Sequence, residues 1–446
     1  MTLPWDTFQP LGRKASTTPA SSARAASDAG GVVVIGAGLA GCWAARLLVE
    51  RAIPVCIIDR HGRAGSGASG NPAGIVKPYV TRSPCLAMSF HELAHHYLVE
   101  QLRQLQLTAS SGFRSCGVLQ LVQRAYPESA SYTSLDDVSS GERAGLPVRS
   151  RTIEFADSGW LNPAALCQLL LDHPLITRYF GREVSSLNKD TDHADDKSGR
   201  LWNIELRDDR TIQAAQLILA CGEATNLIPA AQQLPLIPAR GQISRFALTE
   251  GVKPPQCIVN GKHYVIPDGK SVLVGATFTR DSLDSTVRDE DHALNLAGVQ
   301  QLLPELSIKS AALAGYAGIR ATTPDRLPVV GPLPDFATAA TVYRDLRHGR
   351  VNSQYPTLPV VEDVYIIGGL GSRGVVTAPL CAALVADLIT GVSATLSQHA
   401  STHRRPVSPT FSNLTGGWSD WAPLVNPVRF LIRNLKRGVA HQNGQC

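Results

Sequence analysis

The stretch from Val32 to Asp59, VVVIGAGLAGCWAARLLVERAIPVCIID, constrains the fold of this 446-residue chain more than any other feature. Its first four apolar residues predict a buried strand, and three glycines follow at the spacing G-x-G-x-x-G: Gly36, Gly38 and Gly41. A helix-forming run and a second apolar strand come next, and that strand ends at Asp59. A strand, a glycine turn, a helix and a second strand with a terminal acid are typical of a dinucleotide-binding βαβ unit.

Each of these positions has a physical reason. Gly36 permits the tight turn, Gly38 lets the backbone approach a pyrophosphate, and Gly41 allows the helix to pack closely on the strand. The free N–H groups and the positive dipole end of the helix then face the phosphates. Asp59 follows Gly41 by 18 residues, where an acid accepts hydrogen bonds from an adenosine ribose. The sequence therefore predicts a bound dinucleotide, either FAD or NAD.

Composition narrows the class of protein. Hydrophobic residues make up 44% and charged residues 18% of the chain, which is ordinary for a globular enzyme of two domains. The longest apolar candidate for a membrane span, 375–389, contains Pro379 and Asp387 and is better interpreted as a packed helix. The nine cysteines are odd in number and irregularly spaced, which argues against structural zinc and for a reducing, cytoplasmic environment. We expect neither a membrane anchor nor a metal site.

Three polar segments are expected to lie outside the packed elements. Residues 1–30 are rich in Ala, Ser, Thr and Pro and lack the apolar core of a secretory signal. A disordered lead-in is the main interpretation of this segment, and an organelle transit peptide is the alternative. We interpret 190–200 as a polar loop or hairpin, and 393–420 as a Ser/Thr/Pro-rich connection.

Further glycine-rich elements decide between the two dinucleotides. The segment 62–78, GRAGSGASGNPAGIVKP, has small residues where side chains would collide with a flavin and its pyrophosphate. The strand 217–220 ends in a small residue and a glycine, and a later strand runs into GGLGSRG, 368–374, before a helix whose N-terminus can stabilise a reduced flavin. The pattern favours FAD, held non-covalently because no His or Cys stands at an attachment position. The residues expected to contact it are Gly36, Ala37, Gly38, Leu39, Ala40, Gly41, Asp59, Arg60, Gly67, Ala68, Ser69, Gly70, Asn71, Ala220, Cys221, Gly222, Gly369, Leu370, Gly371, Ser372, Arg373 and Gly374.

Six motifs along the chain point to one family of flavin enzymes. They are GASGNPAGIVKP (67–78), SGWLNPAALC (158–167), PARGQIS (238–244), GIRATTPDRLPVVGPLPD (318–335), GLGSRGVVTAPL (369–380) and NPVRFLIRNLKRG (426–438). In this order they resemble the FAD-dependent oxidase module of the bifunctional tRNA 5-methylaminomethyl-2-thiouridine biosynthesis proteins, within the D-amino-acid oxidase/glycine oxidase superfamily. Only 30 residues precede the flavin motifs, so the family's methyltransferase is expected to be a separate chain or absent.

The resemblance implies an α/β chain, α+β overall, with a Rossmann-like FAD-binding domain and an inserted antiparallel-sheet substrate domain, as in glycine oxidase and D-amino-acid oxidase. We assign the FAD-binding domain to 31–105, 150–232 and 312–400, the substrate domain to 106–149 and 233–311, and a basic C-terminal helix to 420–438. The inserted segments contain apolar runs of strand length, which agrees with this assignment.

The resemblance also implies a reaction. It is the oxidative removal of the carboxymethyl group from 5-carboxymethylaminomethyl-(2-thio)uridine in the tRNA anticodon loop, which gives the 5-aminomethyl base and glyoxylate. The substrate is a neutral secondary amine that gives hydride to the flavin from a carboxylate-bearing CH2 group. One alternative is an oxidase of a free small amino acid or secondary amine, such as glycine or sarcosine. Another is a flavin-binding protein without catalysis of its own.

Three side chains are candidates to act on the substrate. The resemblance implies that Arg320, in AGIRATTPDRLP, binds the carboxylate, and the bidentate fork of an arginine suits this role. Arg373 either contacts substrate or flavin or caps the last glycine turn. Tyr264 either lies over the flavin ring or packs within a strand. Arg240 and Gln242 are weaker candidates for positions near the flavin face.

Basic residues recur along the expected tail helix. Arg429, Arg433, Lys436 and Arg437 fall on one helical face. A basic stripe of this kind binds phosphates without sequence specificity, and the resemblance makes tRNA the expected ligand. The alternative is a solvated amphipathic tail helix.

Overall fold

The computed structural model describes residues 31–83, 85–106, 112–129, 131–189, 201–348, 355–391 and 418–437. The expectations for 1–30, for 190–200 and for most of 393–420 lie outside the described residues. The chain forms two compact units, each built from separate segments. The first unit takes the chain up to Ser66, Cys167–Ile237 and the part from Ala321 onward, and the second takes Gly67–Leu166 and Pro238–Arg320.

This division differs from the expected domain boundaries at 105, 150 and 312. Backbone pairing gives the reason. Strand β8 (Gly159–Leu161) pairs with β3 (Gly74–Val76) and also with β4 (Phe113–Arg114), so two segments expected in the FAD-binding domain join one expected in the substrate domain. The following helix, α2 (Leu86–Gln104), contributes Met88 to a buried cluster of the second unit. Hydrogen bonds and apolar packing therefore place 67–105 and 150–166 in the second unit.

A six-stranded sheet forms the centre of the first unit. Its order is β20 (Val329–Pro334), β21 (Val360–Gly368), β13 (Gln216–Leu219), β1 (Val32–Ile35), β2 (Val55–Asp59) and β9 (Ile176–Phe180). All neighbours pair in parallel except β20 with β21. The central strands are buried along their length, as parallel strands covered on both faces must be.

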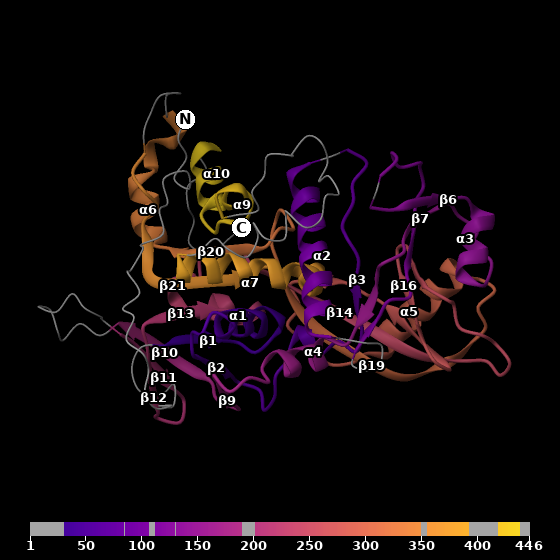
Figure 1. Cartoon of the computed structure of the whole chain (residues 1–446), viewed down its shortest axis with the longest axis horizontal. Helices are drawn as coiled ribbons and strands as arrows, with labels where there is room; N and C mark the ends of the chain where they lie inside the picture. The colour runs from indigo at the N-terminus through magenta and orange to yellow at the C-terminus, as the bar shows by residue number, and fades with distance from the viewer. Residues whose placement is uncertain are drawn as a thin grey trace, which may run out of the picture. The chain divides into compact units, whose positions relative to one another are not determined.

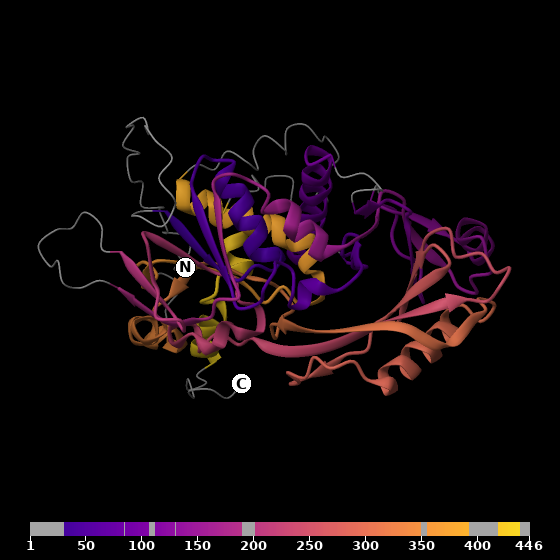
Figure 2. The same ribbon diagram turned by 90° about the horizontal axis from the view of Figure 1, so that it is seen from below.

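Helices and a small sheet cover the central sheet. Helices α1 (Leu39–Val49) and α7 (Gly374–Thr390) lie side by side (Figures 1 and 2). A second buried cluster brings residues of the sheet together with α6 (Phe336–Val342), the 3₁₀ helix η4 (Arg344–His348) and α10 (Arg429–Arg437). The remaining elements are β10 (Val184–Lys189), β11 (Trp202–Leu206), β12 (Thr211–Ala214), α9 (Trp418–Val425), η2 (Gly222–Leu227), η3 (Pro229–Ala231) and η5 (Gly371–Arg373).

The helix α7 is very apolar because it belongs to the core. Within the described part of the chain, Gly371–Thr390 is the stretch that is long and apolar enough to cross a membrane. However, 72% of its apolar window is buried inside the structure. Leu380 and Leu384 have no exposed surface at all. This agrees with the packed helix expected for 375–389.

A nine-stranded, mostly antiparallel sheet dominates the second unit. Its path is β18 (Thr279–Arg280), β14 (Ile237–Leu248), β17 (Ser271–Gly275), β16 (Tyr264–Asp268), β15 (Ile258–Asn260), β5 (Val118–Leu121), β7 (Thr152–Phe155) and β6 (Thr133–Leu135), with β19 (Ile308–Thr322) beside β14. Figure 2 shows the two longest strands, β14 and β19, running side by side. The other elements are η1 (Ala68–Gly70), β4 (Phe113–Arg114), α3 (Asp137–Ala144), α5 (Asp289–Leu302) and α4 (Pro163–Leu170), in which the chain passes to the first unit.

Candidate cofactor and substrate sites

The sheet of the first unit gathers four of the expected FAD-binding segments at one edge. Gly36–Gly41 follows β1, Asp59 ends β2 and Arg60 follows it, 220–222 follows β13, and 369–374 follows β21. These four strands are parallel neighbours, so their carboxyl ends meet. Nucleotide ligands of open α/β sheets bind at this edge. Segments separated by more than 300 residues of sequence thus form one candidate cofactor site.

The glycine turn after β1 leaves no room for side chains. Gly36 has a φ of +107°, and an ideal Cβ on it would lie 2.3 Å from the carbonyl oxygen of Ala220. A Cβ on Gly41 would lie 1.9 Å from the carbonyl oxygen of Gly36. Glycine is therefore required at both positions for β1, α1 and β13 to pack together. The geometry agrees with the roles that the sequence predicts for the first and third glycines.

Asp59 holds this turn through both carboxylate oxygens. Its Oδ2 accepts a hydrogen bond of 2.6 Å from the backbone N–H of Ala37, while Oδ1 accepts one of 2.8 Å from that of His61. The N-cap of α1 is Gly38, and neither a capping side chain nor an acid occupies the first turn of the helix. A helix N-terminus without a competing anion suits a pyrophosphate. These residues therefore fit the adenosine and phosphate groups of FAD.

An ion pair crosses the same edge. Arg60, at the end of β2, donates to Glu223, just after β13, with an Nη2–Oε1 distance of 2.7 Å. Because β1 lies between these two strands, the pair bridges the end of β1. Glu223 was not among the predicted residues, since nothing in its local sequence indicates that it faces Arg60.

The second unit contains a small pocket that is partly open to solvent. Its lining comes from the loop around η1 and from alternate positions of β14 and β19. The lining residues are Ala68, Asn71, Gly241, Ile243, Tyr316, Gly318 and Arg320. The sequence predicted Ala68 and Asn71 as flavin contacts and Arg320 as a substrate contact, and it missed the other four. The sequence did contain a signal for two of these four. Tyr316 and Gly318 stand four and two positions before Arg320, so they share its face in a strand.

Arg320 is the cation of this pocket. Its side chain is partly buried and makes no hydrogen bond or ion pair with any described residue. An ideal Cβ on Gly241 would lie 2.1 Å from its Nη1 atom, so the guanidinium rests on the bare backbone of β14. A partly buried guanidinium without a carboxylate partner is poised to bind an anion.

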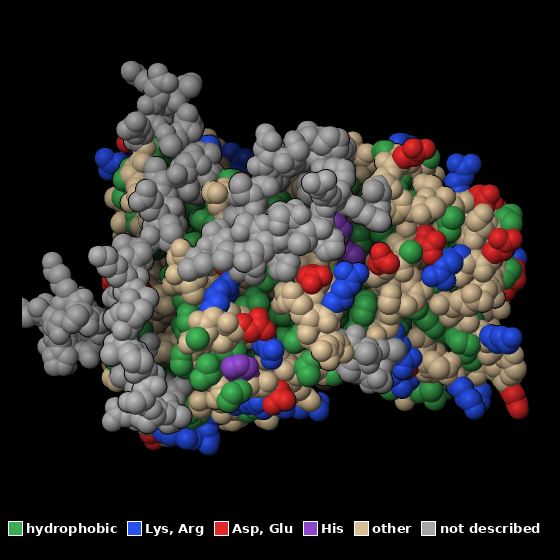
Figure 3. Space-filling model, in the orientation of Figure 1, with side chains coloured by type: hydrophobic (Ala, Val, Ile, Leu, Met, Phe, Trp, Pro, Cys, Tyr) green, Lys and Arg blue, Asp and Glu red, His purple; other side chains and the backbone are tan. Residues whose placement is uncertain are grey.

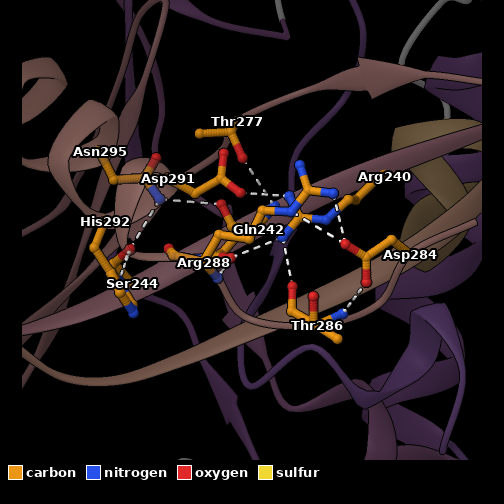
Figure 4. A network of polar contacts seen from close by, with 10 residues as sticks. All are labelled: Arg240, Gln242, Ser244, Thr277, Asp284, Thr286, Arg288, Asp291, His292 and Asn295. Carbon is orange, nitrogen blue, oxygen red and sulfur yellow. Dashed lines mark hydrogen bonds and ion pairs between the residues drawn. The ribbon is translucent and has the colours of Figure 1, made fainter. Parts of the chain in front are cut away.

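Arg240 and Gln242 lie on the other side of β14 and do not line the pocket. Both are fully buried, and Figure 4 shows them in a polar network with the start of α5. The guanidinium of Arg240 is paired with Asp291 and donates to the carbonyl oxygen of Thr286 at 2.6 Å. Gln242 accepts a 2.8 Å hydrogen bond from the N–H of Arg288. Strand alternation turns both side chains toward α5, and their expected position near the flavin face stays a prediction.

Tyr264, on β16, lies within electrostatic range of Arg320. Its ring packs over Gly275, where an ideal Cβ would lie 2.6 Å from the hydroxyl oxygen. Burial raises the pKa of Tyr264, and the charge of Arg320 only partly opposes this effect. The hydroxyl is therefore protonated near neutral pH and can act as a hydrogen-bond donor. It is not one of the residues that line the pocket.

Arg373 belongs to the first unit, where it ends η5 and is the N-cap of α7. Its carbonyl oxygen accepts a 3.1 Å hydrogen bond from the hydroxyl of Thr377. The side chain of Arg373 makes no capping hydrogen bond to α7, and the capping role that the sequence offered as one alternative stays a prediction. A contact of its side chain with flavin or substrate stays a prediction.

The tail helix α10 forms as expected, but Arg429 does not point into solvent. Its Nε and Nη2 atoms donate to Asp325 at 2.9 and 3.0 Å, and its Nη1 donates to the carbonyl oxygens of Val425 and Asn426. With 8% of its side chain exposed, Arg429 is a buried structural residue. Its predicted role as a phosphate ligand is therefore wrong, because a carboxylate distant in sequence already holds it. Lys436 and Arg437 are exposed, and Arg433 is partly exposed.

No cluster of three or more His, Cys, Asp or Glu side chains that could hold a metal ion occurs among the described residues.

Comparison with known proteins identifies the family. A model of the family described as FAD dependent oxidoreductase (DAO) matches residues 31–388. The tRNA 5-methylaminomethyl-2-thiouridine biosynthesis bifunctional protein MnmC of Chromobacterium violaceum is 32% identical over 428 residues, which cover 91% of this chain and 60% of that protein. The protein of the same name from Pseudomonas fluorescens is 33% identical over 431 residues, with 92% and 60% covered. The chain thus spans about 60% of the length of these relatives.

Solved structures share the fold. Glycine oxidase from Geobacillus kaustophilus has a TM-score of 0.62 at 20% identity, covering 80% of this chain and 94% of that one. Iminodiacetate oxidase from Chelativorans sp. BNC1 has a TM-score of 0.59 at 21% identity, covering 81% and 95%. The predicted fold class is confirmed, as is the prediction of an FAD-dependent oxidoreductase. The chain belongs to the FAD-dependent oxidoreductase (DAO) family.

Proposed function

We propose that this chain acts in tRNA wobble-uridine modification. It would oxidatively remove the carboxymethyl group of 5-carboxymethylaminomethyl-(2-thio)uridine and leave the 5-aminomethyl base. The relatives that match most of this chain are named for the biosynthesis of a 5-methylaminomethyl-2-thiouridine. The single observation that carries the proposal is the unpaired guanidinium of Arg320 in the pocket of the second unit. The substrate offers the matching group, a carboxylate one carbon away from the amine.

The reductive half-reaction balances with FAD and water, and turnover requires an electron acceptor, such as oxygen, that reoxidises FADH2. The secondary amine R–NH–CH2–COO⁻, with FAD and one water, gives the primary amine R–NH2, glyoxylate and FADH2. Non-covalently bound FAD would supply the two-electron oxidation. The residues that would hold it are those of the glycine turn, Asp59, 220–222 and 369–374, at the carboxyl edge of the first unit's sheet.

The side chains of the second unit would bind and orient the substrate. Arg320 would take both oxygens of the carboxylate through its fork of N–H donors. Tyr264, kept protonated by burial and within electrostatic range of Arg320, would donate a further hydrogen bond to the substrate. The partly buried position of Arg320 would lower the local dielectric and so strengthen its ion pair with the carboxylate. No general base is needed, because the CH2 carbon beside the neutral amine gives up its hydrogen as hydride.

The remaining partners follow from this reaction. The substrate would be a tRNA anticodon loop, whose target base is splayed out of the stack, as single-stranded RNA bases are when proteins read them. A separate methyltransferase could act on the 5-aminomethyl product. We place the reaction in the cytoplasm, where mature tRNA is available, and it requires neither metal nor membrane.

The decisive test uses the FAD-loaded protein and an anticodon stem-loop that carries 5-carboxymethylaminomethyl-2-thiouridine. Nucleoside mass spectrometry should show conversion to the 5-aminomethyl base, with one glyoxylate released per base. A matched stem-loop with unmodified uridine is the control. An unchanged nucleoside together with rapid flavin reduction by glycine or sarcosine would overturn the proposal and support the free-amine oxidase instead.

A further inference from the structure

Two basic segments that are distant in sequence pack against each other in the first unit. Tyr343 directly precedes η4, and Leu346 lies within it. Both belong to the same buried cluster as Leu431 and Ile432 of α10. The helix α10 contacts both η4 and α6, and Figure 1 shows α10 near α6. The outward faces of η4 and α10 therefore belong to one stretch of surface.

The outward face of η4 carries two arginines. Residues three apart eclipse each other in a 3₁₀ helix, so Arg344 and Arg347 project on the same side. Both are exposed, while Leu346 between them is 4% exposed and packs in the core. The apolar contact of Leu346 thus turns both cations toward solvent.

The outward face of α10 carries three cations. Arg433, Lys436 and Arg437 stand at the spacing i, i+3 and i+4, which places them on one side of the helix. The guanidinium of Arg433 lies 5.1 Å from the centre of the Phe430 ring, which holds it at the rim of the core. The last turn projects beyond the core, and there Lys436 and Arg437 are exposed.

These five cations have almost no anionic neighbours. Arg347, Arg433, Lys436 and Arg437 form no ion pair with any described residue. Arg344 approaches only Asp345, at 3.8 Å, and both side chains are at least 75% exposed, so solvent screens the contact. In contrast, acidic and basic side chains are interspersed over much of the described surface in Figure 3.

We propose that Arg344, Arg347, Arg433, Lys436 and Arg437 form a binding surface for the phosphate backbone of RNA. This η4–α10 surface rests on the proposed function and names how the tRNA is held outside the pocket. Closely spaced cations without carboxylate partners bind a polyanion by releasing its condensed counterions, and this binding depends little on sequence. Neither Arg344 nor Arg347 is in the tail helix, so the surface extends beyond the stripe seen in the sequence.

The test measures tRNA affinity separately from turnover. The FAD-loaded full chain is compared with two double variants, R344E/R347E and K436E/R437E. The control R124E/K253E has the same charge change at two exposed positions of the second unit. Affinity for the modified stem-loop is measured by fluorescence anisotropy over a range of salt concentrations. Flavin absorbance and the melting temperature report that each variant is folded.

Each double variant should lose about tenfold or more in affinity near 0.1 M salt. The slope of log K against log salt should fall in magnitude by about 1.4 to 1.8, which corresponds to two lost phosphate contacts. The control should change affinity by less than about twofold. If both variants keep wild-type affinity and still convert the modified base, the proposal of an RNA-binding η4–α10 surface is wrong. The proposed function is not affected by that result.

Two other outcomes separate the proposals. A wild-type protein that neither binds nor converts the stem-loop would overturn the proposed function and the surface together. Cosedimentation with phosphatidylglycerol/phosphatidylcholine vesicles provides the second arm. Loss of vesicle binding without loss of tRNA binding in the double variants would assign the cations to an anionic membrane and reject RNA.

Discussion

Gly241 lies directly beneath the guanidinium of Arg320, so that an ideal Cβ on Gly241 would stand 2.1 Å from Nη1 of the arginine. The same Cβ would lie 2.9 Å from the carbonyl oxygen of Thr277. The backbone at Gly241 therefore cannot easily move away from the arginine to make room for a side chain. The position of the one cation that lines the described pocket is therefore set by the absence of a side chain on the neighbouring strand.

We predict that G241A raises KM for the carboxymethylamine substrate by about 10-fold to 100-fold. The added methyl displaces the guanidinium, and a charge-assisted hydrogen bond is worth about 1.5–3 kcal/mol. Steady-state kinetics on the modified stem-loop measures the change, with flavin content as a check on folding. The matched control is G62A, whose Cβ would meet no atom within 4 Å. An unchanged KM for G241A would show that Arg320 does not bind the carboxylate from this position.

We predict that R320A lowers kcat/KM by about 100-fold or more, and that R320K recovers only part of this loss. Lysine keeps the charge but has no planar fork for two carboxylate oxygens. The comparison substrate is an amine in which an ester replaces the carboxylate. With this substrate, R320A and wild type should differ by less than about threefold. An equal loss on both substrates would mean that the arginine supports the fold and not the carboxylate.

We predict that Y264F raises KM by about threefold to tenfold, by a factor that stays constant between pH 7 and pH 9. Removing one neutral hydrogen bond costs about 0.5–1.5 kcal/mol. The constancy follows because burial, only partly opposed by Arg320, raises the pKa of Tyr264 above its ordinary value of about 10. A pH series of KM values for both proteins measures the ratio. A ratio that collapses between pH 7 and pH 9 would contradict a protonated hydroxyl donor.

We predict that D325N lowers the free energy of unfolding by about 3 kcal/mol at pH 7. It leaves the buried guanidinium of Arg429 without its carboxylate, and breaking such a pair is costly. Chemical denaturation followed by tryptophan fluorescence measures the loss. E50Q, which breaks the more exposed pair with Arg46, is the control and should cost less than about 1 kcal/mol.

The loss in D325N should depend on pH in a defined direction. Burial alone would raise the pKa of Asp325, but the hydrogen bonds and charge of Arg429 outweigh it and hold that pKa below its ordinary value. The pair therefore stabilises the fold above the unfolded carboxyl pKa of about 3.9, and this stabilisation is lost as the pH falls through the lower folded value. The difference between wild type and D325N should shrink below about pH 4. A difference that grows on acidification would reverse this assignment.

Local patterns were sufficient to predict the candidate cofactor edge. The spacing of Gly36 and Gly41, the acid at Asp59 and the later glycine turns each depend on residues close in sequence. Parallel pairing then brings the segments together, since every one of them follows a strand. Such features are predictable because backbone geometry imposes the same residue types wherever the arrangement occurs.

Features that depend on distant partners could not be predicted in this way. Arg429 stands on the same helical face as Arg433, but its role is decided by Asp325, 104 residues away in sequence. Arg240 and Gly241 are adjacent, and strand alternation sends one into a polar network and leaves the other under Arg320. The motif PARGQIS does not reveal whether its odd-numbered or its even-numbered residues face the pocket. That choice depends on what packs on each face of the sheet, and the start of α5 covers the face that carries Arg240 and Gln242.

The burial of α10 has a consequence for how the protein can be altered. Phe430, Leu431 and Ile432 fill the core beneath the nucleotide-binding sheet, while the same short helix ends in exposed cations. Deleting the C-terminal segment would therefore expose that core along with removing the charges. A truncation that removes α10 therefore cannot test its charges alone. A variant that loses the charges but keeps the fold must come from point substitutions in the last turn of the helix.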